Sequence, residues 1–223
     1  MKKSSILILI IICLVGCKKG SNETTITGEI KGLGTDTLYL YGMDELYDRI
    51  DTIYVENDKF SYTTSVDTIT SAYLLLKNRI EYPVFLDKGN KIKIKGDTIN
   101  LNFLTISGNI YNEEFTDFQK ALEDPADPSE KAGEETVDKR ITVEKANTAE
   151  EMAEEFILQH HSSYVSLYLL DKYFVQKETP DFSKIKKLVE VMTGVLQDKP
   201  YIERLNETIT QAEKSEIGKY APF

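Results

Sequence analysis

Few residues in this 223-residue chain could perform covalent or metal chemistry. There are two cysteines, Cys13 and Cys17, and two histidines, His160 and His161. Three residues separate the cysteines, so they form no Cys-x-x-Cys motif. Adjacent helical residues point about 100° apart, so the histidines cannot readily share a metal ion, and we expect them at a helix C-terminus. No Gly-x-Ser-x-Gly occurs. We therefore predict a chain that is not an enzyme and holds no metal or cofactor.

Cys17 follows a leader of the secretory type. Lys2 and Lys3 precede ten consecutive apolar residues, 6–15. A membrane-spanning helix needs about 20 apolar residues, so this run is too short to span a bilayer. Its length is that of a signal-peptide core. A plain secretory leader with a chance cysteine remains the alternative at this point.

The end of the leader, Leu14-Val15-Gly16-Cys17, resembles the lipobox of bacterial lipoproteins. The resemblance implies a signal peptide at 1–16, a diacylglycerol on the Cys17 thiol, acylation of the new amino group and a polar tether within 17–24. Several acyl chains hold a protein on a membrane stably, whereas one does so only marginally. In the sorting rule of enteric bacteria, Asp directly after the lipidated cysteine favours retention at the inner membrane. Position 18 is Lys, so the resemblance implies a cell-envelope location at the outer membrane.

The charge distribution argues against nucleic acid and anionic lipid surfaces as partners. The formal net charge is −10. Residues 18–110 carry 13 acidic and 11 basic side chains, and residues 111–217 carry 24 and 13. Nucleic-acid binding needs a basic patch, and an acidic body gains nothing from an anionic lipid surface. We expect no nucleic-acid partner, and membrane contact through the lipid alone.

Residues 25–110 have the period of two that is typical of strands. Short alternating segments are separated by turn residues such as Gly89 and Asn90, which predicts an antiparallel β-sandwich or a barrel-like sheet. Lys91, Lys93 and Lys95 share one face of a segment, which predicts a solvated or edge strand. A phosphate site at these lysines is the weaker alternative, because no glycine-rich loop or helix N-terminus accompanies them.

Residues 111–216 change to the helical period. One face is formed by Tyr111, Phe115, Phe118 and Leu122. The expected helix starts are Asn109 or Asn112, Thr148 with Glu151 as a capping box, Ser162 or Ser163, Pro180-Asp181 and Pro200. Strands followed by helices predict an α+β fold with a C-terminal antiparallel helical bundle.

Two groups of residues could mark a ligand site. Four tyrosines alternate along the predicted strands and could line a groove, although tyrosine is also simply a good strand residue: Tyr39, Tyr41, Tyr54 and Tyr62. The acidic residues of two short segments are expected to be surface charge: Asp44, Asp48 and Asp51, and Glu150, Glu151, Glu154 and Glu155.

Three stretches together resemble one family. Gly218, Ala221 and Pro222 resemble the phrase that opens the redox domain of TlpA-like thiol:disulfide oxidoreductases, although Phe223 comes one position early. Residues 107–109 ahead of 113–115, and residues 162–170, resemble the domain of unknown function that precedes that redox domain in membrane lipoproteins.

The resemblance implies a non-catalytic accessory domain that positions a redox domain or protein partner, with 217–223 as the start of a truncated thioredoxin-like domain. The family's redox chemistry belongs to a Cys-x-x-Cys after that phrase. Thiol exchange needs a thiolate, so we do not expect this polypeptide to perform it. The alternative is a lipoprotein that binds a glycan or peptide and has no redox link.

Overall fold

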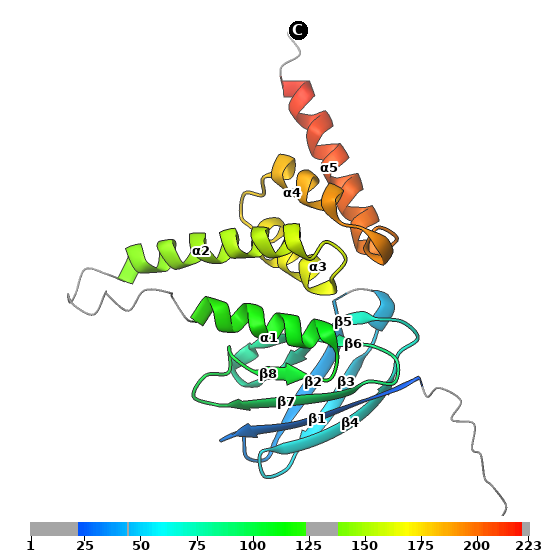
Figure 1. Cartoon of the computed structure of the whole chain (residues 1–223), viewed down its shortest axis with the longest axis vertical. Coiled ribbons are helices and arrows are strands. Elements are labelled where there is room, and N and C mark those ends of the chain that lie inside the picture. The colour runs from blue at the N-terminus through cyan, green and yellow to red at the C-terminus, as the bar shows by residue number, and fades with distance from the viewer. Residues whose placement is uncertain (1–21, 44, 124–137, 220–223) are drawn as a thin grey trace, which may run out of the picture.

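Within the described residues, two four-stranded sheets form an open β-sandwich in the first half of the chain, and five α-helices follow it (Figure 1). The structure is a computed structural model that describes residues 22–43, 45–123 and 138–219. The α+β prediction is confirmed, as a sandwich rather than a closed barrel. The strands are β1 (Glu23–Lys31), β2 (Asp36–Gly42), β3 (Ile50–Val55), β4 (Lys59–Ser65), β5 (Thr70–Leu75), β6 (Glu81–Leu86), β7 (Lys91–Asp97) and β8 (Thr105–Ser107).

Alternation along the strands builds the core. Ile92 and Ile94 of β7 are buried, while the lysines between them are exposed. Leu38 and Leu40 of β2 are buried in the same way, with Tyr39 on the opposite face. Successive side chains of a strand point to opposite faces, so each sheet contributes one apolar face to the space between the sheets.

The strand order corrects one expectation. The first sheet runs β4-β1-β7-β8, and the second runs β3-β2-β5-β6. The lysine-bearing strand β7 therefore lies inside its sheet, and the prediction of an edge strand is wrong, although its solvated face is confirmed. The alternation of polar and apolar side chains indicates which face of a strand is exposed to solvent, but not which strands are its neighbours. The β1–β7 pair is parallel, and the other strand pairs are antiparallel.

The helices lie on one side of the sandwich (Figure 1). Helix α1 contacts β8, β6 and α3, and the later helices extend away from the sheets. No helix in the described part of the chain is both long and apolar enough to cross a bilayer. The helices are α1 (Ile110–Glu123), α2 (Asp138–Gln159), α3 (Tyr164–Leu170), α4 (Phe182–Val191) and α5 (Pro200–Lys219), and a π-helical turn, η3 (Asp171–Val175), follows α3 directly.

Several predicted helix starts are confirmed. Asn109 Oδ1 accepts the Asn112 N–H at 3.0 Å, Ser163 Oγ accepts the Val165 N–H at 3.2 Å, and Asp181 Oδ1 accepts the Lys184 N–H at 3.0 Å. Each satisfies a backbone donor that the first helical turn leaves free.

The start predicted at Thr148 is wrong, because α2 already begins at Asp138. No Gly or Pro interrupts the sequence between Asp138 and Gln159, so nothing in it forces a break at Thr148. At the other end of the chain, α5 continues to Lys219, so the first residues of the expected redox-domain start are helical here. Residues 220–223 lie outside the described part.

Helix α1 closes the open side of the sandwich by bonding to the edges of both sheets. Asn112 accepts the Phe85 N–H at 3.0 Å and donates to the Phe85 carbonyl at 2.8 Å, on β6. Thr116 exchanges two 3.0 Å bonds with the backbone N–H and carbonyl of Ile106, on β8. These strands end their respective sheets. The helix thus satisfies backbone groups that an exposed edge would leave open to pairing with another chain.

Candidate functional site

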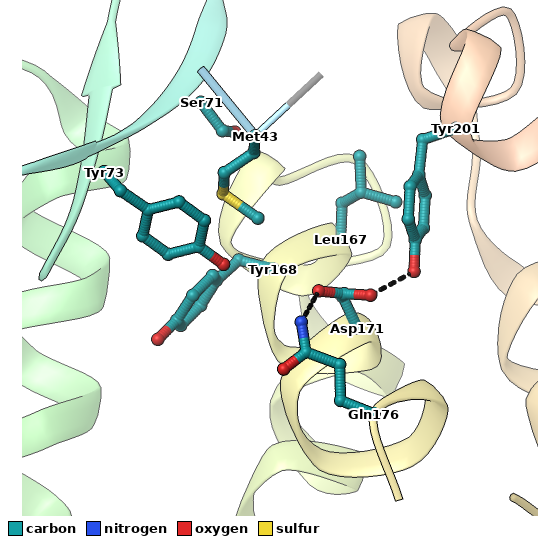
Figure 2. A pocket seen from close by; sticks show the side chains of 8 residues that line it. All are labelled: Met43, Ser71, Tyr73, Leu167, Tyr168, Asp171, Gln176 and Tyr201. Carbon is teal, nitrogen blue, oxygen red and sulfur yellow. Dashed lines mark hydrogen bonds between the residues drawn. The ribbon is translucent and has the colours of Figure 1, made fainter. Parts of the chain in front are cut away.

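A pocket of about 120 Å³ lies where the second sheet meets the helices (Figure 2). We call it the Asp171 pocket. Its walls come from segments that are far apart in the sequence: the end of β2, β5, α3, the π-helical turn and α5. The lining residues are Met43, Ser71, Tyr73, Leu167, Tyr168, Asp171, Gln176 and Tyr201.

Two side chains hold the Asp171 carboxylate in place. The Tyr201 hydroxyl donates to Oδ1 at 2.5 Å, and the Gln176 amide donates to Oδ2 at 2.5 Å (Figure 2). A carboxylate oxygen has two lone-pair positions, so each oxygen can still accept a further hydrogen bond. The carboxylate is therefore fixed in orientation but not saturated.

Three tyrosines around this carboxylate remain protonated at neutral pH. Burial raises the pKa of Tyr73, Tyr168 and Tyr201 well above the ordinary value for tyrosine, and the negative charge of Asp171 raises all three further. A low-polarity environment and a nearby anion both disfavour the phenolate. Their hydroxyls are therefore neutral, and the hydroxyl of Tyr201 donates to the Asp171 carboxylate.

The π-helical turn places Asp171 at the pocket. Helix α3 is buried along its whole length, and η3 continues it with the wider spacing of a π-helix. Gln176, which caps this turn through a backbone bond to the Asp171 carbonyl, also contributes its side chain to the pocket. Such single π turns occur frequently at functional sites.

The structure separates the predicted site residues. Cys17 lies outside the described residues. His160 follows the end of α2, as expected, and its ring stacks on Phe156 with the ring centres 4.1 Å apart. Within the residues that the structure describes, no three His, Cys, Asp or Glu side chains are grouped to hold a metal ion.

The four tyrosines of the expected groove do not share a site. Tyr39 and Tyr54 are exposed on the outer face of β2 and β3. Tyr41 donates to Glu81, with its ring 5.7 Å from the ring of Tyr73. Tyr62 lies on β4, in the other sheet.

Two of the acidic residues expected to be surface charge form ion pairs or hydrogen bonds with other side chains. Glu150 of α2 forms ion pairs with Lys177 and Lys184, and these lysines lower its pKa although burial opposes the shift. Asp51 accepts hydrogen bonds from Tyr47 and Arg49. These carboxylates therefore join neighbouring segments rather than form a cation site.

A family model described as a domain of unknown function (DUF4369) matches residues 24–115. This span covers the sandwich and the beginning of α1, and it includes three of the pocket residues, Met43, Ser71 and Tyr73. Searches of the curated proteins and of the solved structures found no significant match.

Proposed function

We propose that this chain is a lipid-anchored, non-catalytic accessory domain of the cell envelope that serves a thiol:disulfide oxidoreductase. The observation that carries the proposal is the position of Cys17, directly after Leu14-Val15-Gly16 and an apolar run too short to span a bilayer. The outer membrane is the proposed location.

The proposed anchor and the proposed lack of redox activity depend on the same atom. Cys13 would leave with the leader, and a thioether to diacylglycerol would occupy the Cys17 sulfur. A sulfur in a thioether cannot form the thiolate that disulfide exchange requires. The redox cysteines would therefore belong to a thioredoxin-like domain or protein that this domain positions.

The redox association is tested by capture from native membranes. The full chain, tagged at its C-terminus, is cross-linked in cells of its own organism, solubilised in detergent and purified, and its partners are identified by mass spectrometry. We expect a thioredoxin-like protein with a Cys-x-x-Cys to be enriched over a tagged, unrelated lipoprotein. Equal recovery with both baits would contradict the redox association.

A second candidate function is supported by the outer face of the second sheet. Tyr54 is 73 % exposed, Ile50 is 72 % exposed and Tyr39 is 42 % exposed. Tyr39 is paired with Thr52, so Tyr54 and Ile50 are its diagonal neighbours on the same face. Exposed apolar groups gathered in this way are a feature of binding surfaces. Here they would form an aromatic platform for a glycan or a peptide.

This alternative predicts that ring removal weakens binding. Glycan and peptide arrays would first identify a ligand of the full chain. The double variant Tyr39→Ala/Tyr54→Ala should then bind about tenfold more weakly, since aromatic contacts each contribute about 0.5–1.5 kcal/mol beyond area burial. The matched Tyr39→Phe/Tyr54→Phe variant retains both rings and should retain most of the affinity. Unchanged binding by the alanine variant would exclude the platform.

A further inference from the structure

We propose that the Asp171 pocket binds a primary alkylammonium group, that is, an ammonium at the end of a short aliphatic chain. The proposal does not depend on the lipid anchor or on a redox partner. It rests on the charge, the hydrogen-bonding groups and the size of the pocket.

The charge of the pocket favours a cation. Among the residues that the structure describes, Asp171 is the only acidic residue of the lining, and the lining includes no Lys or Arg. Across residues 22–43, 45–123 and 138–219, no basic side chain forms an ion pair with Asp171. Its two hydrogen-bond donors, Tyr201 and Gln176, are neutral. A partly buried carboxylate without a counter-charge is stabilised by a ligand that brings one.

Two basic residues, Lys172 and Arg204, lie close to residues of the pocket lining. The Lys172 ammonium lies over the rings of Tyr168 and Tyr173, 5.6 and 5.4 Å from their centres. The Tyr168 hydroxyl points away from Asp171 (Figure 2). Arg204 lines the neighbouring groove, which shares only Met43 with the pocket lining. Neither of them forms an ion pair with Asp171 among the described residues, so the carboxylate can still pair with a cationic ligand.

The hydrogen-bonding groups favour a primary ammonium over a quaternary one. A primary ammonium has three N–H donors, as a lysine side chain does. Both Asp171 oxygens can accept a further bond. The Tyr73 hydroxyl extends toward the middle of the lining residues, and it makes no hydrogen bond within the described chain (Figure 2). A quaternary ammonium has no N–H group and would leave these acceptors unpaired.

The size and the walls of the pocket indicate which chemical group can carry the ammonium. The cavity volume is about 120 Å³, and one water molecule needs about 10–15 Å³ on the same measure. The pocket therefore has room for an ammonium and a few methylenes. Met43 and Leu167 supply an apolar wall for the methylenes (Figure 2). A lysine side chain, the N-terminus of a peptide and a free alkylamine share this chemistry.

The test is isothermal titration calorimetry, in which n-butylammonium chloride is titrated into the full chain in detergent. We expect saturable binding in the millimolar range, as suits a ligand of five heavy atoms. Neutral 1-butanol should not compete. Asp171→Asn preserves the shape of the side chain and should weaken binding at least about tenfold, because the hydrogen bond to a charged group is lost.

Two further variants and a folding measurement make the test independent of folding and of net charge. Asp117→Asn makes the same charge change on the exposed side of α1 and should leave the affinity unchanged. Tyr73→Phe retains the ring, removes one acceptor and should weaken binding several-fold. Thermal unfolding measured by circular dichroism shows whether the Asp171→Asn variant is folded. If it is not folded, the affinity of the Tyr73→Phe variant tests the proposal instead.

The source of the amine is found with two further probes. Nα-acetyl-lysine amide presents a side-chain ammonium, and alanine amide presents an α-ammonium beside a peptide bond. Binding of either supports the proposal and identifies the amine. Three results would overturn it: no saturable binding of n-butylammonium up to about 50 mM, well above the range expected of so small a ligand; equal binding of 1-butanol; or full affinity in folded Asp171→Asn.

Discussion

Replacing Cys17 with alanine is expected to release the protein from membranes and to abolish its labelling by palmitate. Each buried methylene contributes about 0.8 kcal/mol to membrane binding, and stable attachment needs more than one acyl chain. Without the Cys17 sulfur no diacylglycerol can be attached. The remaining apolar run, residues 6–15, is too short to hold the chain as a spanning helix. Cell fractionation and metabolic labelling measure both effects.

Cys13 supplies the matched control for this experiment. It lies in the same leader, four positions earlier, and the proposal gives it no role after cleavage. The Cys13→Ala variant should therefore be labelled by palmitate and bound to membranes like the wild-type chain. Membrane retention of Cys17→Ala, or equal loss of label in both variants, would contradict the lipid anchor.

Replacing Asn112 with alanine is expected to lower the free energy of unfolding by about 2–3 kcal/mol, because an unsatisfied buried polar group costs about 1–3 kcal/mol and the lost side chain leaves a cavity. Asn112 is buried, and it is the side-chain partner of the Phe85 N–H. The Phe85 carbonyl keeps its bond from Asn109, at 2.8 Å. For a chain of this size the melting temperature should fall by about 4–12 °C.

Asn206 provides the comparison on another helix. It is exposed on α5, so Asn206→Ala should change the free energy of unfolding by no more than about 0.5 kcal/mol. Urea unfolding followed by circular dichroism gives both values. A loss in Asn112→Ala no larger than in Asn206→Ala would show that the bonds from α1 to β6 do not stabilise the fold.

Local features were predictable from the sequence because they depend on neighbouring residues. Ile92 and Ile94 alternate with lysines, and the strand they form has one buried and one exposed face. Ser163 and Asp181 precede helices and cap them. The parallel pairing of β1 with β7 joins Thr25 to Lys91, and no local pattern records it. The place of β7 inside its sheet follows from that pairing, and so it was missed.

The Asp171 pocket was not predictable for a related reason. Tyr201 lies 30 residues after Asp171, and Tyr73 lies on a strand of the sandwich. None of them belongs to a motif with fixed spacing. In the sequence, Asp171 follows Leu169 and Leu170 and looks like the polar end of an apolar helix. Only the fold brings the carboxylate under the tyrosines, so residue types and spacing alone gave no indication of the site.

The position of β1 has a mechanical consequence. Its residues pair with β4 from Glu23 to Glu29 and with β7 from Thr25 to Lys31, so backbone ladders hold it on both sides. Tension applied through the residues before Glu23 acts along the strand, and ladder hydrogen bonds lie across that direction. The bonds must then shear together, whereas a strand at the edge of a sheet can peel away one bond at a time. Under the proposed lipid anchor, the domain would be tethered through this strand, at a point that resists being pulled open.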